Sequence, residues 1–117
     1  KLSEGVIQLE NGLQYKVLKT AKGNPPQNGD RVKIHVQGKH VDGNIFENTF
    51  ELKTPVTVTV GTTLRGLDEA LRRMPAGEKW ELFIPANLGF GQRGSPPLVG
   101  PNETLIYEVE LLEILGK

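Results

Sequence analysis

The most constraining feature of this sequence is that its apolar residues occur in short alternating stretches, separated by segments rich in glycine and proline. Val56, Val58 and Val60 alternate with threonines, and an alternation with period two is typical of a half-buried strand. The chain contains 14 glycines and 8 prolines, most of them between these stretches, where they favour turns. The pattern therefore predicts a β-rich domain with many turns.

Other stretches also have strand-like alternation. Asp42-Gly43 predicts a tight turn that leads into Ile45-Phe46, whereas the glycines and prolines between residues 86 and 103 predict a long loop. The further predicted strands cover residues 12–18, 31–39, 79–84 and 105–114.

One segment, residues 63–74, has the features of a helix. Thr62 or Thr63 is expected to cap its start, acidic residues come early and arginines late, and Pro75 with Gly77 is expected to end it. Its apolar residues share one face at helical spacing, namely Leu67, Leu71 and Met74.

These elements predict an α+β fold, in which a twisted antiparallel sheet of about five strands wraps over one short helix. A chain of 117 residues has the usual size of one domain. We assign residues 12–117 to that domain. Residues 1–11 are expected to form a lead-in, the end of an upstream segment.

Composition excludes several classes of function. The 14 basic and 14 acidic residues cancel, which gives no electrostatic reason to expect nucleic acid as a partner. The absence of cysteine excludes thiol catalysis and thiolate metal sites. The apolar runs are too short for a transmembrane segment. His35 and His40 are expected on opposite faces of one strand, so no metal site is predicted.

Short motifs in a fixed order carry a stronger signal than any of these patterns. The motifs are Gly12-Leu13-Gln14-Tyr15, Gly29-Asp30-Arg31-Val32, Asp42-Gly43-Asn44-Ile45-Phe46, Arg65-Gly66-Leu67-Asp68, Met74-Pro75-Ala76-Gly77, Phe90-Gly91 and Gly100-Pro101-Asn102-Glu103-Thr104-Leu105. In this order they resemble the FKBP-type peptidyl-prolyl cis-trans isomerases, and they are most similar to the bacterial branch that includes the macrophage-infectivity-potentiator proteins. The resemblance extends from Gly12 to Leu115.

The resemblance implies an apolar cleft that holds prolyl peptides and needs neither a cofactor nor a metal ion. It implies that Phe46, Glu47 and Phe90 are catalytic. It also implies that the backbone N–H of Val99 binds a carbonyl of the ligand. The substrate-binding residues that it implies are Val36, Val56, Leu64, Leu67, Val99 and Tyr107.

Several cleft positions differ from the usual family pattern. Val36 and Phe90 stand where tyrosines are usual, Glu47 replaces aspartate, Leu67 replaces tryptophan and Tyr107 replaces phenylalanine. Two hydroxyl groups are lost in this way, and one is gained on another wall. We therefore expect weakened isomerase activity and only weak binding of macrolide ligands.

Three functions stay open at this point. The chain is either an isomerase that assists the folding of proline-containing polypeptides, a catalytically poor FKBP-like binding module or chaperone domain, or a structural interaction domain. The same apolar cleft residues would be ordinary core in a chain without the resemblance. The bacterial branch implies the periplasm or cell surface of a Gram-negative bacterium, with the cytoplasm as the alternative, and dimerisation through an upstream segment.

Overall fold

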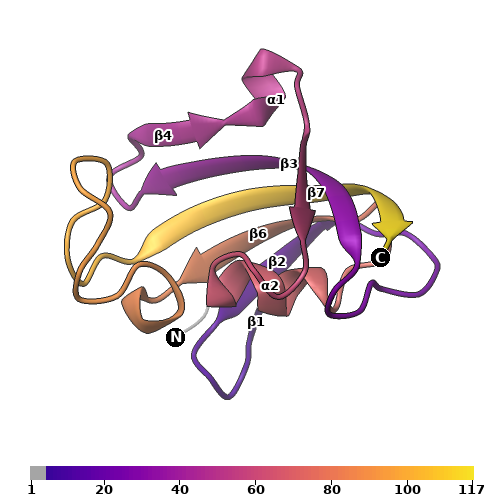
Figure 1. Ribbon diagram of the computed structural model, residues 1–117. Coiled ribbons are helices and arrows are strands. Elements are labelled where there is room, and N and C mark those ends of the chain that lie inside the picture. The colour runs from indigo at the N-terminus through magenta and orange to yellow at the C-terminus, as the bar shows by residue number, and fades with distance from the viewer. Residues whose placement is uncertain (1–4) are drawn as a thin grey trace.

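A single antiparallel sheet organises the molecule in the computed structural model, which describes residues 5–117 (Figure 1). The strands follow the order β1-β2-β6-β7-β3-β4, and β5 pairs with β3 beside β4. The strands are β1 (Val6–Gln8), β2 (Gln14–Lys19), β3 (Arg31–His40), β4 (Ile45–Asn48), β5 (Val56–Thr59), β6 (Lys79–Ile84) and β7 (Leu105–Gly116). The helical elements are α1 (Thr49–Leu52), α2 (Arg65–Leu71) and the short 3₁₀ helix η1 (Ala86–Leu88).

The predicted α+β class is confirmed, but within residues 5–117 the sheet has seven strands rather than about five. The additional strands are β1 and β4, with three and four residues. Neither segment has the regular alternation of apolar and polar residues that identified the longer strands. β1 pairs with β2, so part of the expected lead-in joins the sheet as an edge strand.

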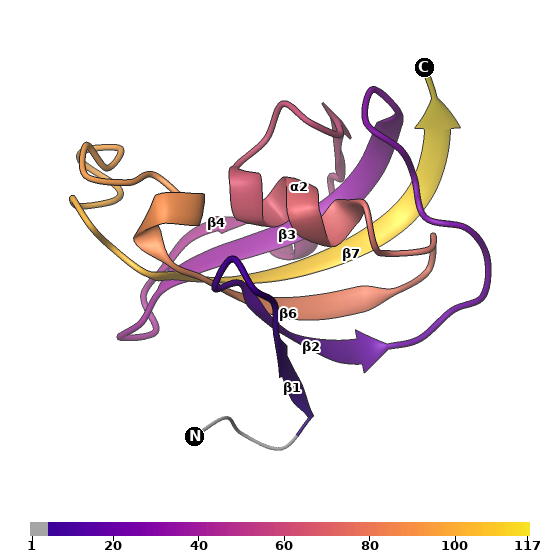
Figure 2. The same cartoon turned by 90° about the horizontal axis from the view of Figure 1, so that it is seen from below.

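Helix α2 covers one face of the curved sheet (Figure 2). The inward positions of β6 and β7 alternate with half-exposed, mostly charged residues, because successive side chains point to opposite faces. The core between helix and sheet contains Leu67, Ala70, Leu71 and Met74 from the helical side and Trp80, Leu82, Ile84, Leu105, Val109 and Leu111 from the sheet.

The start of α2 differs from the prediction. Neither threonine caps the helix: its N-cap residue is Leu64, which makes no side-chain cap. Thr62 instead donates its hydroxyl to the carbonyl of Thr59 (2.8 Å). The Asp68 carboxylate accepts hydrogen bonds from the backbone N–H and the hydroxyl of Thr63. A carboxylate inside the first turn therefore orders the loop before the helix, which side-chain capping rules did not anticipate.

A threonine closes a gap in the sheet next to β3. β4 pairs with residues 37–39 of that strand and β5 with residues 31–34, which leaves Val36 without a ladder partner on that side. The Thr49 hydroxyl at the start of α1 accepts the N–H of Val36 (2.8 Å) and contacts its carbonyl (3.3 Å). The backbone of a buried residue is thereby satisfied where the two neighbouring strands separate.

Candidate active site

A mostly apolar pocket of about 210 Å³ opens between β4, β7 and the loop that follows η1. Figure 1 shows this loop and the β3–β4 hairpin at the same end of the sheet. The pocket is lined by Phe46, Glu47, Phe90, Ser95, Leu98, Val99 and Tyr107. It is an open hollow, so the protein's own side chains do not fill it, as the structural-domain alternative would require.

A β-bulge places two consecutive residues of β4 on the pocket side. Glu47 pairs with Gly38 and Ile45 pairs with Lys39, and the register shifts between these pairs. In a regular strand, neighbouring side chains point to opposite faces, whereas an extra residue in a bulge breaks that rule. Phe46 and Glu47 therefore both line the pocket.

Two aromatic rings meet at the wall of the pocket above a glycine. The rings of Phe46 and Tyr107 lie edge to face, with centroids 6.0 Å apart and planes at 80°. A Cβ atom at Gly38 would lie 2.8 Å from Cζ of Phe46 and 3.1 Å from Cζ of Tyr107. The absence of a side chain at Gly38 is thus what allows both rings to lie against β3.

The opposite wall belongs to the loop between η1 and β7. The side chain of Val99 is buried and that of Leu98 is 57% exposed. The backbone N–H of Val99 donates to the carbonyl of Ser95 (2.9 Å), and the N–H of Ser95 donates back to Val99 (2.8 Å). The tight turn of the loop thus already uses the Val99 N–H, and its expected hydrogen bond to a ligand carbonyl stays a prediction. Val99 contributes its side chain.

The pKa values of both titratable side chains in the pocket are raised. Glu47 is exposed on β4, but the surrounding pocket partly desolvates its carboxyl group and raises its pKa. Burial, followed by the nearby charge of Glu47, raises the pKa of the Tyr107 phenol. The Tyr107 hydroxyl therefore stays protonated and able to donate a hydrogen bond at physiological pH.

The pocket unites five of the predicted residues, namely Phe46, Glu47, Phe90, Val99 and Tyr107. The other four lie elsewhere. Val36 and Leu67 are buried in the core, Leu64 packs against that core from the N-cap of α2, and Val56 lies on β5 with 36% of its surface exposed. The functional roles of all nine residues remain predictions.

Two pocket residues were missed by the sequence interpretation, Ser95 and Leu98. Both lie in the segment expected to be a loop, where side chains follow no periodic pattern. A loop folded back on itself by the Ser95–Val99 bridge gave no signal in the sequence beyond its glycines and prolines.

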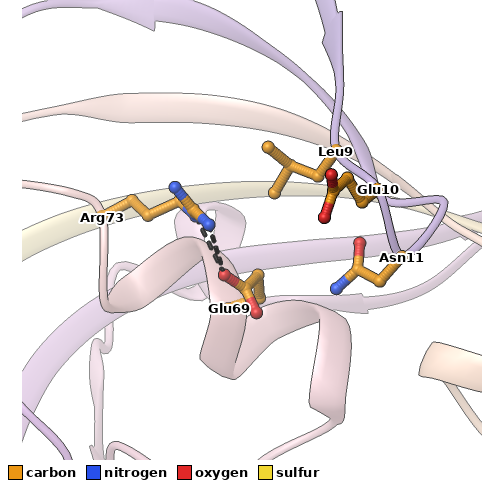
Figure 3. A pocket seen from close by; sticks show the side chains of 5 residues that line it. All are labelled: Leu9, Glu10, Asn11, Glu69 and Arg73. Atoms are coloured by element: carbon orange, nitrogen blue, oxygen red, sulfur yellow. Dashed lines mark hydrogen bonds and ion pairs between the residues drawn. The ribbon is translucent and has the colours of Figure 1, made fainter.

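A larger hollow of about 350 Å³ lies beside α2 (Figure 3). It is lined by Leu9, Glu10, Asn11, Glu69 and Arg73. Figure 3 shows Arg73 paired with Glu69, 2.9 Å apart. Leu9 is the one apolar side chain in its otherwise polar, ion-paired lining, which suits a prolyl ring poorly, so size does not make it the candidate site.

The histidines belong to separate surroundings. His35 contacts the Thr49 hydroxyl (3.0 Å) and stacks on Phe50, whereas His40 pairs with Glu103. Within residues 5–117, no group of three or more histidines, cysteines, aspartates and glutamates is arranged to hold a metal ion. No helix in this part of the chain is long and apolar enough to span a membrane.

Comparisons with known proteins agree with this architecture. The family model for FKBP-type peptidyl-prolyl cis-trans isomerases matches residues 22–112. Over 117 residues the chain is 38% identical to the peptidyl-prolyl cis-trans isomerase Mip of Coxiella burnetii, covering 100% of this chain and 51% of that protein. It is 39% identical over 114 residues to the outer membrane protein MIP of Legionella longbeachae, covering 97% and 49%.

The crystal structure of FkpA from Escherichia coli superposes with a TM-score of 0.90 at 33% identity, covering 96% of this chain and 52% of that one. The chain thus spans about half the length of these relatives. The names of the two curated relatives confirm the resemblance to the macrophage-infectivity-potentiator branch. The chain belongs to the family of FKBP-type peptidyl-prolyl cis-trans isomerases.

Proposed function

We propose that this chain catalyses the cis–trans isomerisation of peptide bonds before proline in polypeptides, and that it assists their folding. The observation that supports the proposal most directly is the open apolar pocket between Phe46, Tyr107 and Val99, in a chain of this family. A prolyl ring is apolar and compact, and such a pocket can remove it from water.

Prolyl isomerisation depends on the polarity of the surroundings of the amide and needs no nucleophile. The barrier to rotation about an amide bond is about 18–20 kcal/mol, because rotation destroys its resonance. In the twisted state the carbonyl is less polar, so an apolar pocket disfavours the planar amide more than the twisted one. No covalent bond is made or broken, so the reaction requires no cofactor.

The five predicted residues that line the pocket each receive a role in this proposal. Phe46, Phe90 and Val99 hold the prolyl ring by apolar contact, while Glu47 lies at the edge of the pocket beside the peptide. The neutral phenol of Tyr107 donates a hydrogen bond to a substrate carbonyl. It thereby replaces, from another wall, a hydroxyl that Phe90 lacks.

The remaining predicted residues act through the shape of the pocket. Val36 and Leu67 are core residues in contact with the same hydrophobic cluster as Tyr107. Because they lack the hydroxyl and the indole usual in the family, we expect reduced activity. A lost hydrogen bond is worth about 0.5–1.5 kcal/mol, which corresponds to a factor of about ten or less in rate. Leu64 and Val56 would contact the peptide beyond the prolyl ring.

Exchange NMR on short Xaa-Pro peptides, with and without the protein, tests this proposal. We expect faster cis–trans exchange with the protein, and a large loss in Phe46→Ala. Phe50→Ala is a matched control, because Phe50 is an equally large aromatic residue that packs on His35 outside the pocket. Equal exchange rates with and without the folded protein would refute the proposed activity.

A second function is favoured by the exposed apolar side chain of Leu98 at the mouth of the pocket. This side chain could hold unfolded segments without turnover, as expected for a binding module or chaperone domain. Val99→Trp should fill the pocket and abolish peptide binding. If wild-type protein binds prolyl peptides in that assay without accelerating exchange, the binding function replaces catalysis.

We also propose a cellular setting. The name of the Legionella relative, an outer membrane protein, supports a location in the envelope of a Gram-negative bacterium, either the periplasm or the cell surface. Cell fractionation would distinguish this location from the cytoplasm.

We propose that residues 12–117 form the isomerase domain, that its pocket binds macrolides weakly, and that the protein dimerises through an upstream segment. Sedimentation of the chain with and without added upstream sequence tests the last point.

A further inference from the structure

The loop between η1 and β7, which forms one wall of the pocket, is linked to the β3–β4 hairpin by a single carboxylate. One oxygen of Glu103 accepts a hydrogen bond from Nδ1 of His40, the last residue of β3. Its other oxygen accepts the backbone N–H of Gly100 (2.7 Å). The two oxygens of one side chain therefore join segments that lie 63 residues apart.

The other backbone hydrogen bonds of this loop are local. The N–H groups of Gly94 and Asn102 donate to Phe90 and Gly91, and those around the Ser95–Val99 turn pair with each other. The β3–β7 ladder ends at the pair His40–Leu105, so the last residues of the loop are already held beside β3. Within residues 5–117, the Glu103 carboxylate connects the earlier part of the loop, at Gly100, to the end of β3 at His40. Burial of Leu88 and Val99 holds the loop on the core, but apolar burial does not fix its distance from the hairpin.

Both ends of this link reach residues of the pocket. The ring of His40 lies against the ring of Phe46, with centroids 5.1 Å apart and planes at 49°. At the other end, Gly100 directly follows Val99. Phe46 lies on β4 and Val99 in the loop, and both line the pocket. The pair His40–Glu103 therefore connects the two segments that carry these residues.

We propose that His40 and Glu103 are positioning residues that set the width of the prolyl pocket, an inference that rests on the proposed isomerase function. Neither side chain lines the pocket, so both act through Phe46 and Val99. With the pair intact, the two walls stand at the separation that fits a prolyl ring. When it breaks, the loop and the hairpin separate and the ring is held less closely.

The charge of Glu103 controls the link. Hydrogen bonds from His40 and then from the Gly100 N–H lower the pKa of Glu103, and partial burial and Asp42 act in the opposite direction. The carboxylate therefore stays charged to lower pH than an ordinary glutamate. Once it is protonated, it loses acceptor strength toward both partners.

Two substitutions of His40 separate hydrogen bonding from packing. His40→Leu still packs a side chain against Phe46 but cannot donate a hydrogen bond to Glu103. His40→Gln can donate this hydrogen bond but has no ring to pack against Phe46. We expect kcat/KM to fall about three- to tenfold in both Glu103→Ala and His40→Leu, as expected for one partly exposed charged hydrogen bond. His40→Gln should recover most of this loss.

The double variant and a matched control complete the set. His40→Leu combined with Glu103→Ala should lose no more than either single variant, because residues that act as one unit are non-additive. Glu113→Ala is the control, since it removes another cross-strand ion pair, with Lys33 (3.9 Å), far from the pocket residues. Additive losses, or a His40→Gln variant no better than His40→Leu, would overturn the proposal.

An NMR titration decides the inference even if the wild-type protein proves inactive. The Gly100 amide and the ring of Phe46 should shift together as Glu103 is protonated, and this shared transition should disappear in Glu103→Gln. Independent titration of the two signals would show that the walls are not joined. Failure of the isomerase proposal would instead appear as a lack of turnover with the shared transition intact.

Discussion

Replacing Gly38 by alanine should damage the pocket more than it damages the fold. The added Cβ would lie 2.8 Å from Cζ of Phe46 and 3.1 Å from Cζ of Tyr107. Ordinary carbon–carbon contacts are about 3.5–4.0 Å, so both rings must move by several tenths of an ångström or more. Gly38 does not have a positive φ, so the backbone itself accepts alanine and the effect is steric.

The magnitude follows from overpacking. Inserting a methyl group into a packed site costs about 1–3 kcal/mol, whereas a domain has about 5–15 kcal/mol of stability. The variant therefore remains folded at 25 °C. Displacement of catalytic groups by about 1 Å costs up to about 100-fold in rate, so we expect kcat/KM for an Xaa-Pro peptide to fall roughly 10- to 100-fold.

The assay compares this variant with Gly77→Ala. A Cβ at Gly77 would lie 3.1 Å from Cβ of Ala21, and its φ of +99° is unfavourable for alanine. This glycine donates to Leu111, away from the pocket residues, so Gly77→Ala should lose stability in urea and keep its kcat/KM. Unchanged kcat/KM in Gly38→Ala would refute the reasoning, as would equal losses of activity in the two variants.

Other predictions concern the sheet and the charge in the pocket. Thr49→Val leaves the N–H of Val36 unsatisfied and should lower the free energy of unfolding in urea by about 1–3 kcal/mol. Thr49→Ser keeps the hydroxyl and should retain most of this stability, whereas a Thr49→Val variant as stable as wild type would contradict the role of the hydroxyl. Tyr15→Leu removes a ring stacked 4.1 Å from Trp80 and should cost at least about 0.5–1.5 kcal/mol with kcat/KM unchanged, as checked by tryptophan fluorescence during unfolding. The folded pKa of Glu47 is raised, so its contribution to stability is complete below the unfolded pKa and is lost as pH rises through the folded pKa. The free energy of unfolding of Glu47→Gln relative to wild type, measured in urea, should therefore be higher at pH 7 than at pH 3. A difference of the opposite sign would exclude burial as the cause of the raised pKa.

The sequence predicted those parts of the fold in which burial alternates along a strand. Residues 79–84 are observed as β6 with the predicted bounds, because every second side chain there is buried. The predicted strand over residues 31–39 shows the same alternation, and it extends one residue further because His40 pairs with Leu105 of β7. Segments whose structure depends on a distant partner were less accessible: β1 exists through its pairing with β2, and α1 through the contact of Thr49 with β3.

The start of helix α2 was also not predictable from local sequence alone. The face of Leu67 and Leu71 was predicted from spacing and is buried. The start of α2 was not, because the Asp68 carboxylate, from within the helix, satisfies N–H groups of the preceding loop. Local capping rules rank residues by type and position, whereas the choice between Thr63 and Asp68 is made by the folded loop.

The candidate site was harder to predict from the sequence than the fold, because it forms where regular strand geometry is interrupted. Alternation along β4 would place Phe46 and Glu47 on opposite faces, and only the family resemblance placed both in one pocket. The bulge opposite Gly38 is the physical reason that they can share it. Ser95 lay outside any periodic signal, because its place is set by the bridge to Val99.

These features together indicate why the pocket forms at this end of the sheet. Where β6, β7 and β3 pair regularly, inward side chains interdigitate with α2 and leave no room for a ligand. The pocket opens where that regularity stops: β4 bulges, Gly38 provides no side chain, and the chain between η1 and β7 bonds to itself rather than to the sheet. Beyond the last ladder pair, His40–Leu105, no strand pairing within residues 5–117 sets the distance between the loop and the hairpin. We expect side chains to set this distance, and His40 with Glu103 is a pair that connects the two segments.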